Sequence, residues 1–155
     1  MAFFLWMSRL DGQLQDVGGG MGVLDLQFAF TAEKGRQILE VWGENGRALA
    51  RQGLIWDCVY PLVYGLAFEA TLIRLFSSTS RWRNLIVLLP LWTILFDYGE
   101  NFLHWQTLRI YPIIDGAVLQ LASSWALVKW ALVATMIFLM GYKLVRRQFL
   151  KLDPA

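Results

Sequence analysis

The chain has 155 residues, of which 57% are hydrophobic and only 17% are charged. Because a soluble domain carries about 25% charged residues, this chain has too little polar surface to cover itself in water. A formal net charge of +2 is too small to indicate a protein that binds nucleic acid. The single cysteine excludes an intrachain disulfide framework and every multi-cysteine metal motif. The composition therefore predicts a small polytopic membrane protein with one domain.

Residues 1–23 are predicted to form a flexible or interfacial N-terminal segment. The apolar run 2–7 is far too short to cross a bilayer, and Arg9, Asp11 and Asp16 interrupt any extension of it. The glycines within 18–22 indicate a flexible segment. Its basic residue follows the apolar run, whereas the basic residues of a signal peptide come first. The alternative interpretation is a fourth, degenerate transmembrane helix, or a first helix that is missing from this N-terminus.

Residues 24–53 are predicted to form an amphipathic extracytoplasmic segment. Residues 24–30 alternate apolar with small or polar side chains, which is typical of an extended segment. Thr31 is placed to cap a helix over 32–42, which Gly43 ends. One face of that helix is apolar and the other is charged, so we expect it to lie at the outer headgroup level of a membrane.

Residues 54–142 are predicted to be the transmembrane part of an all-α integral membrane helical bundle. The stretches 54–76, 85–108 and 117–142 each have the roughly 20 mostly apolar residues that a membrane-spanning helix needs. The loop between the first two stretches and the tail 143–155 are basic, which places both in the cytoplasm by the positive-inside rule. We therefore expect a multi-pass protein of a cell membrane, such as the bacterial inner membrane, with a cytoplasmic C-terminus.

Four short motifs resemble those of a group of small uncharacterised bacterial membrane proteins. The motifs are Leu-Asp-Leu-Gln-Phe at 24–28, Trp-Gly-Glu-Asn-Gly-Arg at 42–47, Asp57 with Tyr-Pro-Leu-Val-Tyr-Gly at 60–65, and Asp-Tyr-Gly-Glu-Asn at 97–101. The resemblance covers residues 24–104 and implies a polytopic membrane protein, without a biochemical function to carry over. Members of the group have a full membrane helix before the first motif, and this chain departs from them there.

The second predicted span carries a stripe of polar side chains. Asp97, Glu100, Asn101 and His104 are spaced i, i+3, i+4 and i+7, so all four project from one side of the helix. An ionisable group near the centre of a bilayer costs about 2.5 to 3.5 kcal/mol on insertion scales. We therefore expect this stripe to face protein or water rather than lipid.

The first predicted span offers partners for that stripe. Asp57, Tyr60 and Tyr64 have the same spacing, and the two helices run in opposite directions. At about 1.5 Å of rise per residue, Asp57 should be level with His104, Tyr60 with Glu100 and Asn101, and Tyr64 with Asp97. The sequence thus predicts one polar pocket near the outer face, which Gln120, Ser123 and Ser124 of the third span approach at a similar depth.

Three functions are compatible with such a pocket. The leading prediction is binding of a small or amphiphilic ligand, or of a proton or cation, by Asp57, Tyr60, Tyr64, Asp97, Glu100, Asn101 and His104. The first alternative is a membrane enzyme in which His104 and Glu100 form an acid–base pair. The second is an accessory or scaffold subunit whose stripe docks a partner helix.

Cofactors and partners are less defined by the sequence. The spacing of His104, Glu100 and the aspartates matches no established metal-ligand motif, so no metal is predicted, and no cofactor is identified. Ser123 or Ser124 with His104 would be the elements of a hydrolase, but the surrounding residues contain no nucleophile elbow. Membrane lipids are the expected partners, together with a second copy of the chain or another membrane protein, and not nucleic acid.

Glu69 and Lys129 lie well inside the first and third predicted spans. Measured from the outer ends of those spans, the two residues are at similar depth. A structural ion pair between Glu69 and Lys129 would explain why both charges are tolerated there.

Overall fold

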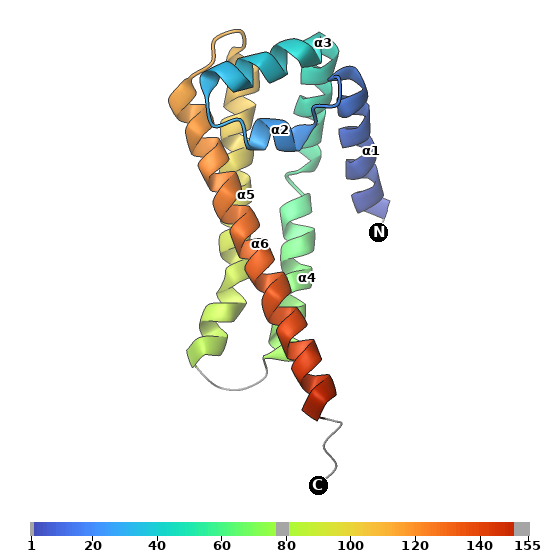
Figure 1. Cartoon of the computed structure of the whole chain (residues 1–155), viewed down its shortest axis with the longest axis vertical. Helices are drawn as coiled ribbons and strands as arrows, with labels where there is room; N and C mark the ends of the chain where they lie inside the picture. The colour runs from blue at the N-terminus through green and yellow to red at the C-terminus, as the bar shows by residue number, and fades with distance from the viewer. Residues whose placement is uncertain (1, 77–80, 151–155) are drawn as a thin grey trace.

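The computed structural model describes residues 2–76 and 81–150, and within these ranges its regular elements are all helices. In chain order they are α1 (Ala2–Val17), α2 (Val23–Gln27), α3 (Ala32–Trp56), α4 (Tyr60–Leu75), α5 (Arg81–Ile110) and α6 (Gly116–Leu150). Figure 1 shows an elongated bundle in which α4, α5 and α6 run along the long axis. The short α2 and the first part of α3 lie across one end of this bundle. The predicted all-α class is confirmed.

Within residues 2–76 and 81–150, two helices are by themselves long and apolar enough to cross a membrane. These candidate spans are Arg83–Ile110 of α5 and Gly116–Arg146 of α6, which pack along each other more extensively than any other pair of helices. Asp115 caps the N-terminus of α6, because its Oδ1 accepts hydrogen bonds from the backbone N–H groups of Ala117 (2.8 Å) and Val118 (3.3 Å). The helix continues to Leu150, so it extends well beyond the predicted end of the third span at residue 142.

The first predicted span is not one straight helix. Residues 54–56 belong to α3, residues 57–59 form a turn, and α4 begins at Tyr60. Together α3 and α4 qualify as a third candidate span, bent by 42° at this break. Pro61, in the first turn of α4, accounts for the interruption, since proline has no N–H to donate to the preceding turn and its ring clashes there.

A second bend divides α3 at Gly43. This residue has φ 60° and ψ −164°, a left-handed backbone conformation that glycine adopts without steric cost. The preceding part of α3 lies across the end of the bundle, and the following part turns toward α4 (Figure 1). The predicted end of a helix at Gly43 is thus confirmed, as is the cap, because Thr31 Oγ1 accepts a hydrogen bond from Lys34 N (3.2 Å).

The N-terminal third is more ordered than the sequence indicated. Residues 2–17, predicted to be flexible or interfacial, form the helix α1, which packs against α3. The extended segment predicted for 24–30 is wrong, since Val23–Gln27 is helical. Two carboxylates stabilise the start of α2: Asp25 Oδ2 accepts from Gly22 N and Asp11 Oδ1 accepts from Val23 N, both at 2.8 Å.

A hydrophobic core closes this end of the bundle. It is made of buried side chains from α1, α2, α3, α5 and α6, among them Leu14, Leu26, Ile38, Leu39, Trp42, Leu108 and Leu119. Trp42 also donates a hydrogen bond from Nε1 to Met21 O (2.8 Å), which joins α3 to the connector before α2. The apolar face predicted for the helix 32–42 is therefore buried against the protein.

Candidate functional site

The polar stripe of α5 lies inside the protein. Asp97 is 3% exposed, Glu100 is 0%, Asn101 is 7% and His104 is 3%. Their shared face of α5 is turned toward the break between α3 and α4 and toward α6. The expectation that these side chains avoid the outer surface of the bundle is confirmed.

Two hydrogen bonds connect this stripe to the α3–α4 region. Tyr64 OH donates to Asp97 Oδ2 at 2.6 Å, which confirms the predicted level of these two residues. Asn101 Nδ2 donates to Asp57 Oδ2 at 2.9 Å. Asp57 was expected opposite His104, and its bond to Asn101 places it nearly one turn of α5 away from that position. The bend at residues 57–59 explains the shift, because the predicted depth of Asp57 assumes that the first span is one uninterrupted helix.

Lys129 of α6 completes the cluster. Its Nζ lies 3.2 Å from Asp97 Oδ1 and 2.7 Å from Glu100 Oε2, and all three side chains are buried. The predicted ion pair between Glu69 and Lys129 is therefore wrong, since the ammonium points to α5 rather than to Glu69 of α4. The direction of Lys129 could have been found from its place on α6. It lies on the same face of this helix as Leu119, Ala122 and Ala126, which precede it by ten, seven and three residues and are buried.

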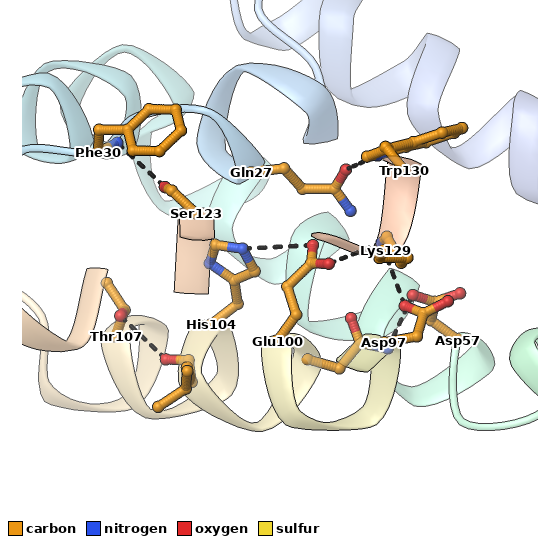
Figure 2. Close-up of polar contacts among 12 residues, drawn as sticks. Gln27, Phe30, Asp57, Asp97, Glu100, His104, Thr107, Ser123, Lys129 and Trp130 are labelled. Carbon is orange, nitrogen blue, oxygen red and sulfur yellow. Dashed lines mark hydrogen bonds and ion pairs between the residues drawn. The ribbon is translucent and has the colours of Figure 1, made fainter. Parts of the chain in front are cut away.

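His104 and Glu100 form the least satisfied part of the cluster. Figure 2 shows the carboxylate of Glu100 between His104 and Lys129. The distance from His104 Nε2 to Glu100 Oε1 is 3.6 Å, which is too long for a hydrogen bond. Neither ring nitrogen of His104 has a hydrogen-bond partner within residues 2–76 and 81–150. A buried imidazole in this state normally has a water molecule or a ligand beside it.

A large pocket lies next to the cluster. Its volume is about 460 Å³, and it is lined by α1, α2, α3, α4 and α6 together with Asp57 and Asp97. One part of the lining is polar, with Asp57, Tyr60, Tyr64, Asp97 and Lys129. The remaining walls are mainly apolar and include Leu10, Leu14, Leu24, Leu49, Phe68, Trp130 and Val133. Trp130 Nε1 donates to Gln27 Oε1 (3.3 Å), so α6 and α2 meet at the wall of this pocket (Figure 2).

A much smaller cavity of about 50 Å³ lies beside the pocket. It is lined by His104, Asn101, Leu108 and Trp42, and it shares Asp57, Gln27 and Gly53 with the large pocket. This volume holds a few water molecules and nothing larger. The side chain of Asp57 thus lies where the two cavities adjoin.

Ser123 and Ser124 of the third span do not join the cluster. Ser123 Oγ accepts a hydrogen bond from Phe30 N (3.0 Å) and so holds the connector between α2 and α3. Ser124 Oγ donates to Gln120 O (2.8 Å) within its own helix. Neither serine lines either cavity.

Tyr60 does line the large pocket, where its ring packs edge-on against Tyr64 with centroids 5.3 Å apart.

The charges of the cluster already include an internal cation. In the part of the chain that the structure describes, no group of three or more His, Cys, Asp or Glu side chains is arranged to hold a metal ion. The ammonium of Lys129 lies between Asp97 and Glu100, at the position where a bound cation would pair with both carboxylates. The chemistry of this arrangement is therefore that of a buried ion-pair network beside a largely apolar pocket.

No family model, curated protein or solved structure matches this chain.

Proposed function

We propose that this chain is an integral membrane protein that binds an amphiphilic ligand in the large pocket. In this proposal α5, α6 and the bent α3–α4 pair cross the bilayer. The support is the outward surface of these helices, which carries large apolar side chains such as Leu91, Leu95, Ile137 and Phe138, each more than half exposed. An apolar surface of this extent is unfavourable in water and matches the interior of a bilayer.

The observation that carries the proposal is the composition of the pocket. Ligand sites are concave and mostly apolar, and a few polar groups placed in them fix the orientation of the ligand. The volume of about 460 Å³ lies in the range of such sites, and the carboxylates and the tyrosines occupy only part of the lining. A hydrocarbon chain along the apolar walls would place a polar headgroup at Asp57, Tyr60 and Tyr64.

Two features favour a binding site over a scaffold or accessory role. A helix that docks a partner through its polar stripe would present Asp97, Glu100 and His104 on its outer surface, whereas all three are buried within the monomer. A purely structural network would satisfy its own members, whereas neither ring nitrogen of His104 has a hydrogen-bond partner among the described residues. Unsatisfied buried groups of this kind favour a ligand or water at the site.

The size of the small cavity favours binding over catalysis. His104 and Glu100 would have to reach a substrate to act as an acid–base pair. His104 lines only the cavity of about 50 Å³, and Glu100 lines neither cavity. A proton or metal cation bound between Asp97 and Glu100 is likewise disfavoured, because the ammonium of Lys129 already occupies that position.

The proposed location is a bacterial inner membrane with the C-terminus in the cytoplasm. The basic residues Arg74, Arg81 and Arg83 flank the connection between α4 and α5, and Lys143, Arg146 and Arg147 lie near the end of α6. The positive-inside rule assigns both regions to the cytoplasm. The pocket and the end covered by α2 then lie toward the outer face. The bacterial membrane proteins whose motifs resemble those of this chain would share this arrangement.

Filling the pocket from Gly53 tests the proposal. A Cβ atom added at Gly53 meets nothing within 4 Å, and Gly53 lines the pocket, so the ring of Gly53→Phe should enter the pocket and occupy part of it. Gly141→Phe is the matched control, because Gly141 also has open space around it and lies outside the pocket. Each protein would be purified in a mild detergent, and bound amphiphiles would be identified by native mass spectrometry. Retention in wild type and Gly141→Phe but not in Gly53→Phe supports the proposal, and equal retention or none in all three contradicts it.

A further inference from the structure

We propose that the headgroup of the pocket ligand is an ammonium, and that its ion partner is the carboxylate of Asp57. This inference rests on the proposed function, and it names the class of amphiphile that the pocket selects: a hydrocarbon chain that carries an amine. Its basis is the distribution of charge, aromatic rings and hydrogen-bond acceptors around Asp57.

The carboxylates outnumber the cations at the polar part of the pocket. Lys129 pairs with Asp97 and Glu100, and Tyr64 OH bonds to the second oxygen of Asp97. Both oxygens of Asp97 are therefore occupied. Within the described residues, by contrast, Asp57 forms no ion pair, and its hydrogen-bond partner is the neutral amide of Asn101. Among these three carboxylates Asp57 is thus the one without an ion partner, and the one with which a cation from outside the protein can pair. Asp11 also lines the pocket, but its two oxygens accept hydrogen bonds from Val23 N and Gln15 Nε2.

Aromatic rings line the pocket beside this carboxylate. Tyr60, Tyr64 and Phe68 succeed one another along one face of α4, with centroids 5.3 Å and 6.1 Å apart, and all three line the pocket. The face of an aromatic ring attracts a cation within about 6 Å of its centroid. Asp57 precedes this row by less than one turn of helix, so a carboxylate and an aromatic ring lie at the same end of the pocket. This combination favours an ammonium over a hydroxyl group of the same size.

The small cavity supplies acceptors for the remaining protons of an ammonium. An ammonium has three N–H donors and no acceptor, and a neutral imidazole has one acceptor nitrogen. His104 is 3% exposed, its ring nitrogens have no hydrogen-bond partner among the described residues, and it lines the small cavity together with Asp57. Water in that cavity can therefore connect a headgroup at Asp57 to the imidazole.

An anionic headgroup meets the opposite conditions. Its cationic partner in the pocket would be Lys129, which is already 3.2 Å from Asp97 and 2.7 Å from Glu100. The uncompensated carboxylate of Asp57 would repel it in a setting where water screens charge poorly. The site therefore discriminates against fatty-acid-type ligands as well as favouring amines.

Three probes with one chain and different headgroups test this inference. Dodecylamine, dodecanol and dodecanoate would be added at matched concentrations to the purified full-length protein in a neutral detergent at neutral pH. The fraction of protein that carries one bound molecule is read by native mass spectrometry. Since a hydrogen bond to a charged group is stronger than one between neutral groups, we expect dodecylamine to bind about tenfold more tightly than dodecanol, and dodecanoate to bind most weakly. This comparison needs no variant, so its outcome does not depend on the folding of a mutant.

A charge-removing variant assigns the selectivity to Asp57. Asp57→Asn should reduce amine binding to the level of the alcohol and leave dodecanol binding unchanged, with folding checked by thermal unfolding. Asp16→Asn, at an exposed position of α1 outside the pocket, is the matched control and should retain the preference. Dodecanoate binding as tightly as the amine, or a preference that persists in folded Asp57→Asn, overturns the inference while the pocket proposal stands. Failure of all three probes to bind wild type overturns both proposals.

Discussion

Lys129 is the residue that makes the buried charges tolerable. Removing two carboxylates from water is costly, and an ammonium with good geometry to both offsets much of that cost. Lys129 meets this condition through contacts of 3.2 Å to Asp97 and 2.7 Å to Glu100. Loss of the ammonium would leave both carboxylates buried without a counter-ion.

Lys129→Met should therefore destabilise the protein strongly. The expected loss is about 3 to 5 kcal/mol, which is typical when one member of a buried ion pair is removed. Adding Glu100→Gln should recover part of that loss, because it removes a carboxylate that the ammonium neutralised. The measurement is the thermal unfolding of the purified variants, supported by their accumulation in membranes.

Glu69→Gln is the control for this rescue. If Lys129 paired with Glu69, the combination Glu69→Gln with Lys129→Met would recover stability and the combination with Glu100→Gln would not. The structure predicts the reverse, so rescue by Glu69→Gln alone would contradict the ion-pair network described here.

Single residues were predictable where the helical spacing was intact. The stripe of α5 and the contact of Tyr64 with Asp97 follow from positions in regular helices. The partner of Asp57 was misplaced because the turn at 57–59 interrupts the count of residues. The partner of Lys129 was missed because depth along a helix says nothing about which face it turns to a neighbour, and the buried small residues of α6 carry that information.

The packing of α5 on α6 depends on a close approach at Gly99. A Cβ atom at this position would lie 1.6 Å from Cζ3 of Trp125, whose ring covers the glycine and packs edge-on against Phe96. Small residues at helix interfaces permit such an approach. Because α5 carries Asp97 and α6 carries Lys129, this contact also positions the ion-pair network.

Gly99→Ala should separate the two helices locally and destabilise the protein. We expect a loss of about 1 to 3 kcal/mol, the usual cost of an extra methyl group in a packed interior. Gly141→Ala adds the same group in open space on α6 and should be neutral or slightly stabilising. Thermal unfolding in detergent compares the two variants, and equal effects of both would argue against the close contact.

Helices that depend on their own composition were predicted, and a helix that depends on a distant residue was not. The long apolar helices α5 and α6 were predicted because their composition alone requires a helical span. The helix α2 was missed because the alternating pattern of 24–30 predicts an extended segment, whereas the caps that stabilise the helix are not visible in that pattern. One of those caps is the carboxylate of Asp11, which reaches Val23 N from twelve residues earlier.

The complete molecule combines a closed end with a pocket below it. The hydrophobic core, with side chains from α1, α2, α3, α5 and α6, lies at the end of the bundle that α2 and the first part of α3 cross (Figure 1). The polar cluster joins α5 to α6 and to the α3–α4 region. The meeting of the two polar stripes was predictable from the sequence. The shape of the pocket was not, because α1 contributes Leu10 and Leu14 to its wall, whereas the leading prediction for residues 1–23 was a flexible or interfacial segment.

The orientation of the chain is testable with reporter fusions. A fluorescent protein that folds only in the cytoplasm should be fluorescent when fused after Ala155, and alkaline phosphatase should be inactive there. The reason is the excess of basic residues near the end of α6 and between α4 and α5. An active phosphatase with a dark fluorescent fusion would reverse the proposed orientation and place the pocket toward the cytoplasm.

Photolabelling in native membranes tests the occupied pocket most directly. A long-chain alcohol with a diazirine in its chain would be added to membranes that contain wild type, Gly53→Phe or Gly141→Phe, and the labelled residues would be mapped by peptide mass spectrometry. The account predicts labelling of pocket residues such as Phe68, Trp130 and Val133 in wild type and Gly141→Phe, and its loss in Gly53→Phe. Labelling confined to outward residues such as Leu91 and Phe138, or unchanged by Gly53→Phe, would contradict it.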